Sequence, residues 1–448
     1  MVTGNALIIL FILSLLLLFF LIIKVRLEPF VSLIGVAFIT ALVVGLDIKE
    51  VSGIVASGFG NTLAGVGILI GLGIIFGEFL AASGAIEKIA QGILRLFGVK
   101  KSSLGIGLTG TVVSIPVFFD AAFVILSGLI KSLSRKTKIS AITFVTALSV
   151  GLIVSHSAVI PTPGPLVVAE NMDADLGLFF LYGLIIAVPA TIVGGYLYGN
   201  LIGKRLDAAG EAELEDVSTQ QQAYKTEIST GLSFFMLSLP IILILGNTVV
   251  SLIAPESVAA TIFSFIGDKN VALFISVILA IIVLKPYIAQ DYKDLFNKAI
   301  DSAGVILLVT GAGGAYGAVI NQSGIGDHLI SVMQGWNVHI FLLAFIFAQI
   351  LRASLGSATV ALVTTSSILG PQVAALGVSP ILLGLAICSG AIGLSLPNDS
   401  GFWVVNRFGK LSISQTLKAW SVGGFIAGVT ALLGVYILSL LSPILPGL

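Results

Sequence analysis

Four short stretches of this sequence place polar, titratable and helix-breaking residues inside long apolar runs. They are SIPVFFD at 114–120, SHSAVIPTPGP at 155–165, RASLGSAT at 352–359 and SLPNDSG at 395–401. Proline and glycine interrupt helices, and each backbone N–H or C=O that an interruption frees inside lipid costs several kcal/mol unless protein or water satisfies it. The four stretches therefore predict broken helices whose polar groups line a cavity within a membrane.

The residue types in these stretches suit the binding of a hydroxylated anion. Hydroxyl groups and free backbone amides form hydrogen bonds with substrate hydroxyls, and the N-terminal ends of half-helices carry a partial positive charge that favours an anion. The candidate binding residues come from all four stretches: Ser114, Asp120, Ser155, His156, Thr162, Gly164, Arg352, Gly356, Ser357, Thr359, Asn398, Asp399 and Ser400.

Arg352 admits two interpretations. A charged side chain at the centre of a membrane helix costs about 2.5–3.5 kcal/mol on insertion scales, so its presence indicates a specific partner. The guanidinium group could bind a substrate carboxylate through two parallel hydrogen bonds. It could equally pair with Asp120 or Asp399 and only stabilise the fold. The sequence leaves both interpretations open.

Three titratable side chains are candidates to carry a coupling proton: Asp120, His156 and Asp399. Carboxyl groups and histidine are the usual members of proton relays inside membranes. Each could instead only fix the tip of a hairpin. Sodium is the alternative coupling ion, because free carbonyl groups together with Asn398 and Ser357 could coordinate it. Glu78 is a further acid within an apolar run, and its role is left open.

The composition places these stretches in a membrane protein. Of the 448 residues, 57% are hydrophobic and 10% charged, with a mean hydropathy of +1.13, whereas soluble domains carry about 25% charged residues. Apolar runs of about 18 residues or more recur along the chain, which indicates a polytopic all-α membrane protein. We predict about ten spanning helices, near 5–23, 29–46, 52–82, 139–170, 175–202, 229–253, 268–284, 299–322, 379–405 and 419–441.

Composition also bounds the partners. The net charge is zero, so no nucleic acid is expected, and the lipid bilayer is the evident environment. One cysteine, Cys388, excludes an internal disulfide, and three scattered histidines form no metal-ligand cluster. We therefore expect no metal and no cofactor. The first apolar run is read as a retained helix, because its basic residues, Lys24 and Arg26, follow it.

Two other apolar runs, about 103–130 and 339–370, are predicted to be re-entrant hairpins. Basic residues flank the first run on both sides, and a single crossing would place one basic cluster outside, against the positive-inside tendency. With both hairpins in place, the N-terminus lies outside. All but three of the 22 Lys and Arg residues then lie on the cytoplasmic side, the exceptions being Lys49, Lys269 and Arg352.

An internal repeat gives the chain its predicted organisation. The segment 71–88 resembles 311–328 at an offset of 240, and each copy precedes a hairpin and a broken helix in opposite orientations. Inverted repeats with broken helices are typical of secondary transporters. We predict an N-terminal half at 1–203, a cytoplasmic linker at 204–228 and a C-terminal half at 229–448.

Other functional classes were weighed against a transporter. The segment GIGD at 324–327 matches a short motif of intramembrane aspartyl proteases, but their second aspartate needs a Tyr-Asp context, and the chain has only the reverse, Asp291-Tyr292. We expect no enzyme. A membrane anion channel stays open as the alternative class, although an inverted repeat with four breaks favours alternating access.

Four segments together resemble the gluconate permease family of proton symporters, within the larger ion-transporter superfamily. They are PVFFDAAFVIL (116–126), SHSAVIPTPGP (155–165), RASLGSATVA (352–361) and NDSGFWVVNRF (398–408), in the family's order. The resemblance implies a prokaryotic cytoplasmic-membrane importer of a small hydroxylated acid, with gluconate first and other sugar acids, glycerate or D-serine as alternatives. It also implies a homodimer formed through a scaffold domain.

The chain departs from the family pattern at two positions. Leu396 stands where the family usually has a histidine, and Ile160 precedes Pro161 where the family often has two prolines. Loss of that histidine removes a titratable group from the second broken helix. It shifts the expectation for the proton carrier towards His156 and Asp120.

Overall fold

The chain is all-helical in the part that the computed structural model describes, with no β-strand there. This confirms the predicted fold class. The cause is the apolar composition, because a helix satisfies its backbone groups within its own segment and needs no water to do so. The structure describes residues 2–98, 101–208, 225–254, 256–325, 328, 339–397 and 399–448.

Within these ranges eight helices are long and apolar enough to cross a membrane. The number is nine if α12 (Val258–Ile266) and α13 (Lys269–Leu284), bent by 68°, form one span. The predicted ten also include α2 (Pro29–Val44), which has 16 residues, and the broken helix that begins with α19 (Pro380–Ile392), whose 13 residues stop at the break. One of the eight, Ala358–Leu376, lies in the second predicted hairpin. Exposed apolar side chains such as Ile9 and Ile282 mark helix faces suited to lipid.

The chain builds the same series of elements twice, each time two helices, a helical hairpin and a broken helix. Helix α2 corresponds to α13, and the two begin 240 residues apart, at 29 and 269. The helices that follow them, α3 and α14, also correspond, and they end 240 residues apart, at 82 and 322. The first series is α2, α3 (Ile48–Ala82), α5 (Ser102–Val113) with α6 (Phe119–Thr137), and α7 (Ala141–Ala158) with α8 (Pro163–Asn171). The second is α13, α14 (Tyr292–Gln322), α16 (Ile340–Leu355) with α17 (Ala358–Leu369), and α19 with α20 (Ser400–Phe408).

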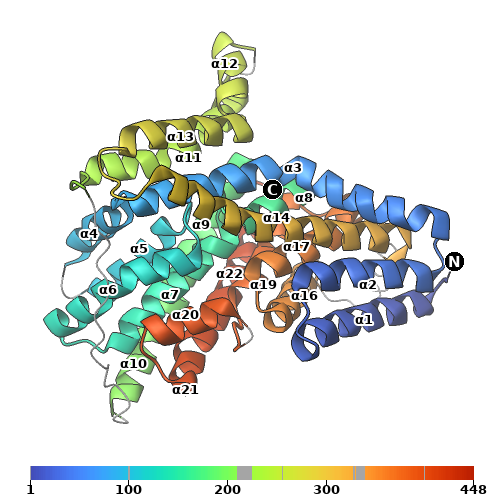
Figure 1. Ribbon diagram of the computed structural model, residues 1–448, viewed down its shortest axis with the longest axis horizontal. Coiled ribbons are helices and arrows are strands. Elements are labelled where there is room, and N and C mark those ends of the chain that lie inside the picture. The colour runs from blue at the N-terminus through green and yellow to red at the C-terminus, as the bar shows by residue number, and fades with distance from the viewer. Residues whose placement is uncertain are drawn as a thin grey trace.

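The long helices α3 and α14 lie side by side and antiparallel (Figure 1). Gly58 lies against Ala318, and twenty residues further along α3 Glu78 pairs with Lys298 at 2.8 Å. Between these contacts, a Cβ at Gly67 would lie 3.7 Å from Leu307, which is the repeat counterpart of Gly67. A residue that meets its own counterpart marks a local two-fold axis, so the two halves are inverted relative to each other.

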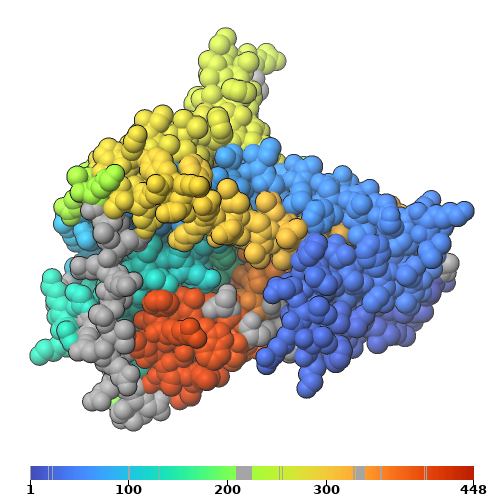
Figure 2. Space-filling view, viewed as in Figure 1, coloured from blue at the N-terminus to red at the C-terminus, as the bar shows by residue number. Residues whose placement is uncertain are grey.

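The remaining helices surround this pair and the broken helices. Helix α12 protrudes from one edge of the molecule, where α11 and α13 meet it (Figures 1 and 2). Helix α10 runs to Ala208, five residues into the predicted linker, and residues 209–224 lie outside the described part of the chain. The other helices are α1 (Asn5–Phe19), α4 (Ala85–Phe97), α9 (Leu176–Ala190), α10 (Tyr198–Ala208), α11 (Thr230–Ile253), α18 (Val373–Leu376), α21 (Ile413–Thr416) and α22 (Val422–Leu441).

Candidate functional site

The first half makes its two interruptions with proline and with hydroxyl groups that turn back on the backbone. At the hairpin tip, the Ser114 hydroxyl donates to the carbonyl of Val117 at 3.1 Å. In the broken helix, the Thr162 hydroxyl donates to the carbonyl of Val159 at 2.6 Å. Pro163 then starts α8 as its first residue, where its missing N–H costs nothing.

The second half makes its interruptions with a glycine and with side-chain caps. Gly356 ends α16 in the left-handed conformation with φ +67°, which glycine adopts without strain. Ser357 caps α17 by accepting from the N–H of Val360 at 3.3 Å. Asp399 caps α20 by accepting from the N–H of Gly401 at 3.0 Å. Each cap satisfies a backbone donor that the break would leave free.

The first hairpin contacts both broken helices. The rings of Phe118 at its tip and His156 in its own half lie 5.9 Å apart. Its next residue, Phe119, reaches the other half, where a Cβ on Gly401 would lie 3.2 Å from the ring. The tip of this hairpin thus bridges the interruptions of α7–α8 and α19–α20.

The second hairpin also contacts both broken helices. The Nη2 atom of Arg352 donates to Oδ2 of Asp399 in its own half at 2.5 Å. On the opposite side, a Cβ on Gly164 of the first broken helix would lie 2.6 Å from Leu362 and 3.6 Å from the Cα of Thr359. The four interruptions therefore close a ring, in which each hairpin tip bridges the two broken helices.

The ion pair between Arg352 and Asp399 is the electrostatic centre of this ring. Arg352 is 2% exposed, and its Asp399 partner also accepts from the Ser395 hydroxyl and from the N–H of Gly401. Within the described part of the chain, Nε and Nη1 of Arg352 have no hydrogen-bond partner. A buried guanidinium group with free donors can accept a second anion.

Asp120 and His156 lie within electrostatic reach of this pair. Both interact with the charges of Arg352 and Asp399. Asp120 stands in the first turn of α6 and its side chain is exposed, whereas His156 is buried near the end of α7. The fold thus brings together the three residues considered for proton transfer.

Several buried polar atoms beside the interruptions have no hydrogen-bond partner among the described residues. In α7 these are the hydroxyls of Ser155 and Ser157 and Nδ1 of His156, and in α17 the hydroxyls of Thr364 and Thr365. Buried polar groups are usually paired, so each of these unpaired atoms is a candidate for contact with a ligand. The sequence prediction missed Ser157, Thr364 and Thr365, because polar residues within an unbroken helical run carry no local signal of which way they face.

The predicted site residues fall into different roles. Backbone groups of the turns form hydrogen bonds with the side-chain oxygens of Ser114, Thr162 and Ser357. Gly164 allows close packing, and Gly356 allows the left-handed backbone conformation. Thr359 is half-buried at the start of α17. Asn398 and the side chain of Ser400 lie outside the described part. Across the described residues, no three His, Cys, Asp or Glu side chains gather as a metal site.

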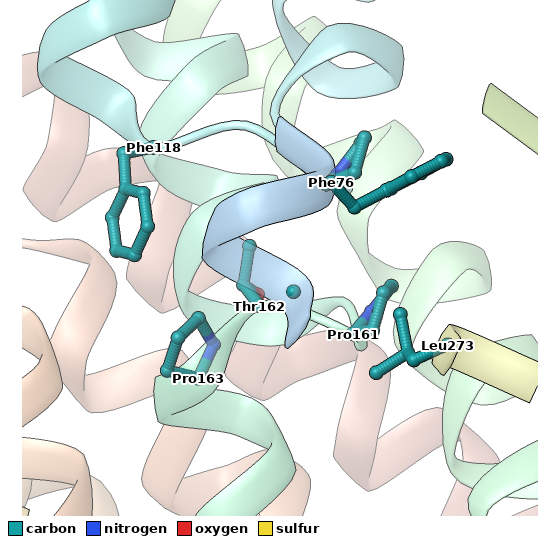
Figure 3. A pocket seen from close by; sticks show the side chains of 8 residues that line it. Phe76, Phe118, Pro161, Thr162, Pro163 and Leu273 are labelled. Carbon is teal, nitrogen blue, oxygen red and sulfur yellow. The ribbon is translucent and has the colours of Figure 1, made fainter. Parts of the chain in front are cut away.

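A small cavity lies between α3 and the two interruptions of the first half, the hairpin tip and the broken helix (Figure 3). Its volume is about 10 Å³, enough for about one water molecule and too small for a six-carbon acid. The candidate site is therefore the polar ring and not this cavity. The cavity is lined by Gly73, Phe76, Pro116, Phe118, Pro161, Thr162, Pro163 and Leu273.

Comparison with known proteins agrees with this architecture. The family model described as GntP family permease matches residues 6–441. The chain belongs to the GntP permease family. It is 35% identical to the inner membrane permease YgbN of Escherichia coli K12, over 92% of this chain and 94% of that one. It is 32% identical to the low-affinity gluconate transporter of the same strain, over 96% and 97%.

A solved structure shares the fold. The YdaH transporter of Alcanivorax borkumensis, reported to have an unusual topology, superposes with a TM-score of 0.65 at 15% sequence identity, covering 92% of this chain and 97% of that one. At this identity the likeness concerns the fold alone. This GntP-family chain is a multi-pass membrane permease and not an enzyme, as its sequence predicted.

Proposed function

We propose that this GntP-family permease imports a small hydroxylated organic acid, with gluconate as the first substrate to test, by proton symport and alternating access. The observation that supports it most is the buried Arg352, which keeps two free nitrogen donors in a ring of interrupted helices. A gluconate transporter among its relatives supports the substrate class.

The site offers complementary groups to such an acid. Arg352 binds the carboxylate through its free donors, beside the Asp399 that holds the guanidinium group in place. The unpaired hydroxyls of Ser155, Ser157 and Thr364 supply hydrogen bonds to the substrate hydroxyls. Thr359 is a further contact in this proposal, and Asn398 and Ser400 stay candidates from the sequence alone.

Charge balance gives a physical reason for proton symport. Asp120, Asp399 and Arg352 together carry one net negative charge when all are ionised, and a bound carboxylate would add a second. Charge inside a membrane is costly, so one proton taken up with the acid lets the loaded and empty sites carry the same charge. We assign this proton to Asp120, because the residue is exposed and lies within reach of the charges of Arg352 and Asp399. His156 and Asp399 are the alternatives that mutation separates.

A sodium-coupled carrier of carboxylates, or of glycerate or D-serine, is the runner-up. Leu396 removes the titratable side chain that resembling sequences carry in the second broken helix, which favours a coupling ion other than the proton. A membrane anion channel is less well supported. An inverted repeat with four interrupted helices is typical of alternating access and not of a continuous pore.

Uptake into proteoliposomes tests this function. The full-length protein should accumulate labelled gluconate when the outside is more acidic than the inside, and a sodium gradient alone should not drive uptake. Asp120→Asn should abolish the dependence on the pH gradient. Uptake that follows only the sodium gradient would identify Na⁺, and not the proton, as the coupling ion. No uptake of gluconate, glycerate or D-serine under either gradient would refute the proposal.

The proposal includes a location and an assembly. We place the chain in the cytoplasmic (inner) membrane of a prokaryote, with its N-terminus outside, as a homodimer. The positive-inside distribution and the relative named as an inner membrane permease support this. The one native cysteine, Cys388, is buried and should not react with an impermeant maleimide. A Thr3→Cys variant in intact cells should react with it if the N-terminus lies outside. Protection of Cys at this position would place the N-terminus inside. Crosslinking in the membrane tests the dimer.

A further inference from the structure

Gln349 is a buried polar side chain to which neither the sequence patterns nor the proposed site assigns a role. It lies on α16, three residues before Arg352, and is 6% exposed. Both atoms of its amide, Oε1 and Nε2, lack a hydrogen-bond partner in the part of the chain that is described. Among the buried side-chain amides of the described residues, no other is left with both atoms unpaired.

The amide of Gln349 lies at the start of the interruption between α19 and α20. A Cβ on Gly393, the residue that ends α19, would lie 3.0 Å from its Oε1 and 3.2 Å from its Nε2. Residues three apart on a helix share a face, so Gln349 and Arg352 face the same interrupted segment. Arg352 meets the far end of that segment at Asp399, and Ser395 lies between the two ends.

A purely structural side chain would not have this arrangement. An amide buried without a partner destabilises a protein relative to an apolar side chain of similar size, and more so inside lipid. Gln372, beyond the other end of α17, shows the structural alternative: it is 7% exposed, and its Nε2 donates to Oδ1 of Asn321 at 3.5 Å. An unpaired amide next to a guanidinium group with free donors indicates that the partner of both is a ligand.

We propose that Gln349 binds a hydroxyl group of the substrate whose carboxylate Arg352 binds, and so makes the permease selective for hydroxylated acids. This inference rests on the proposed function. An amide donates and accepts, which matches a hydroxyl group that does both. An acid without hydroxyl groups would leave the amide unpaired and would bind less tightly, because a site built to bind a hydroxyl group rejects analogues that lack it.

The test compares two six-carbon acids on the full-length protein in nanodiscs. D-gluconate and hexanoate share the carboxylate and the chain length, but only gluconate carries hydroxyl groups. In Gln349→Leu we expect gluconate affinity to fall about tenfold to a hundredfold while hexanoate affinity stays the same or improves. The melting temperature of the unliganded variant should stay the same or rise, because the substitution removes an unpaired buried amide.

The matched control is Gln372→Leu, which removes an equally buried but paired amide. It should lower the melting temperature and leave the ratio of gluconate to hexanoate affinity unchanged. Gln349→Glu, which keeps the size and the acceptor but loses the donor, should weaken gluconate binding as well.

Distinct results would overturn the two proposals. A folded Gln349→Leu protein with the wild-type affinity ratio overturns the role of Gln349, and so does a variant that loses stability or fails to fold. If the wild-type protein takes glycerate instead of gluconate, the same comparison is made with glycerate and propionate. A wild-type protein that binds none of these acids refutes the proposed function itself, and with it this inference.

Discussion

In the first hairpin α5 presents glycines to α7, whereas in the second hairpin α16 presents long polar side chains to the interruption between α19 and α20. Gly107 and Gly110 of α5 lie against the backbone of α7, whereas Gln349 lies beside Gly393 and Arg352 pairs with Asp399. A Cβ on Gly110 would lie 2.8 Å from a backbone oxygen of α7, so no side chain fits there.

The difference shows how two copies of one fold can carry different polar side chains. Both hairpins touch their broken helices at the backbone, Gly151 against Gly107 in the first half and Gly390 against Phe345 in the second, but in the first half the unpaired polar atoms belong to the broken helix, at Ser155 and His156. In the second half the hairpin itself carries the guanidinium and amide groups. The repeat therefore positions both halves but does not make their residues equivalent. We expect the second hairpin to select the substrate and the first to shape the ring.

The largest effect is expected at the ion pair. Arg352→Gln leaves Asp399 buried without its cation, and breaking a buried pair from one side costs about 3–5 kcal/mol. We expect a lower melting temperature in detergent. Uptake should also fall at least about a hundredfold, because the substrate carboxylate loses its charged hydrogen bonds, each of about 1.5–3 kcal/mol.

A double variant separates stability from binding at the same position. In Arg352→Gln with Asp399→Asn, two neutral amides replace the two charges, so much of the melting temperature should return while uptake stays low. Uptake restored to the wild-type level would mean that Arg352 only stabilises the fold, which would remove the assigned difference between the hairpins.

A smaller effect is expected in the first hairpin. A Cβ on Gly151 would lie 2.0 Å from the backbone oxygen of Gly107, so Gly151→Ala must force α5 and α7 apart. Overpacking of this kind costs about 1–3 kcal/mol. Thermal unfolding measures it, with Gly128→Ala on α6 as the control.

The control position has open space around it. No atom lies within 4 Å of a Cβ on Gly128, so its replacement should be neutral or stabilise by up to about 1 kcal/mol, through the helix propensity of alanine. If Gly151→Ala were equally harmless, the contact between Gly151 and Gly107 would not hold the first hairpin against α7.

The smallest effect is expected where the two halves meet. Glu78 pairs with Lys298 at one end of the α3–α14 contact, and the symmetry-related contact at the other end is Gly58 against Ala318. Because the Lys298 side chain is largely exposed, Lys298→Ala should lower stability by about 1 kcal/mol or less and leave the substrate affinity unchanged. A change in gluconate affinity would mean that this pair, unlike its small-residue counterpart, communicates with the site.

Much of the fold and part of the site could be predicted from the sequence. The four interruptions, the hairpins and the 240-residue repeat were all visible, because proline, glycine and apolar runs act locally. The predicted count of about ten exceeds the eight or nine helices that pass a length test, because α2 has only 16 residues and the interruption leaves α19 with 13. Gln349 was missed because one polar residue within an apolar helix looks the same in sequence whether it faces a ligand or a neighbouring amide.

The sequence by itself determined that this chain is helical, membrane-embedded, duplicated and interrupted at four places, because composition and backbone sterics decide these properties within a few residues. Only the tertiary structure decided which interruption meets which. Arg352 and Asp399 are 47 residues apart, and Phe119 meets Gly401 across the two halves. Such contacts depend on how whole helices pack, and long-range packing has no signature in any short stretch of sequence.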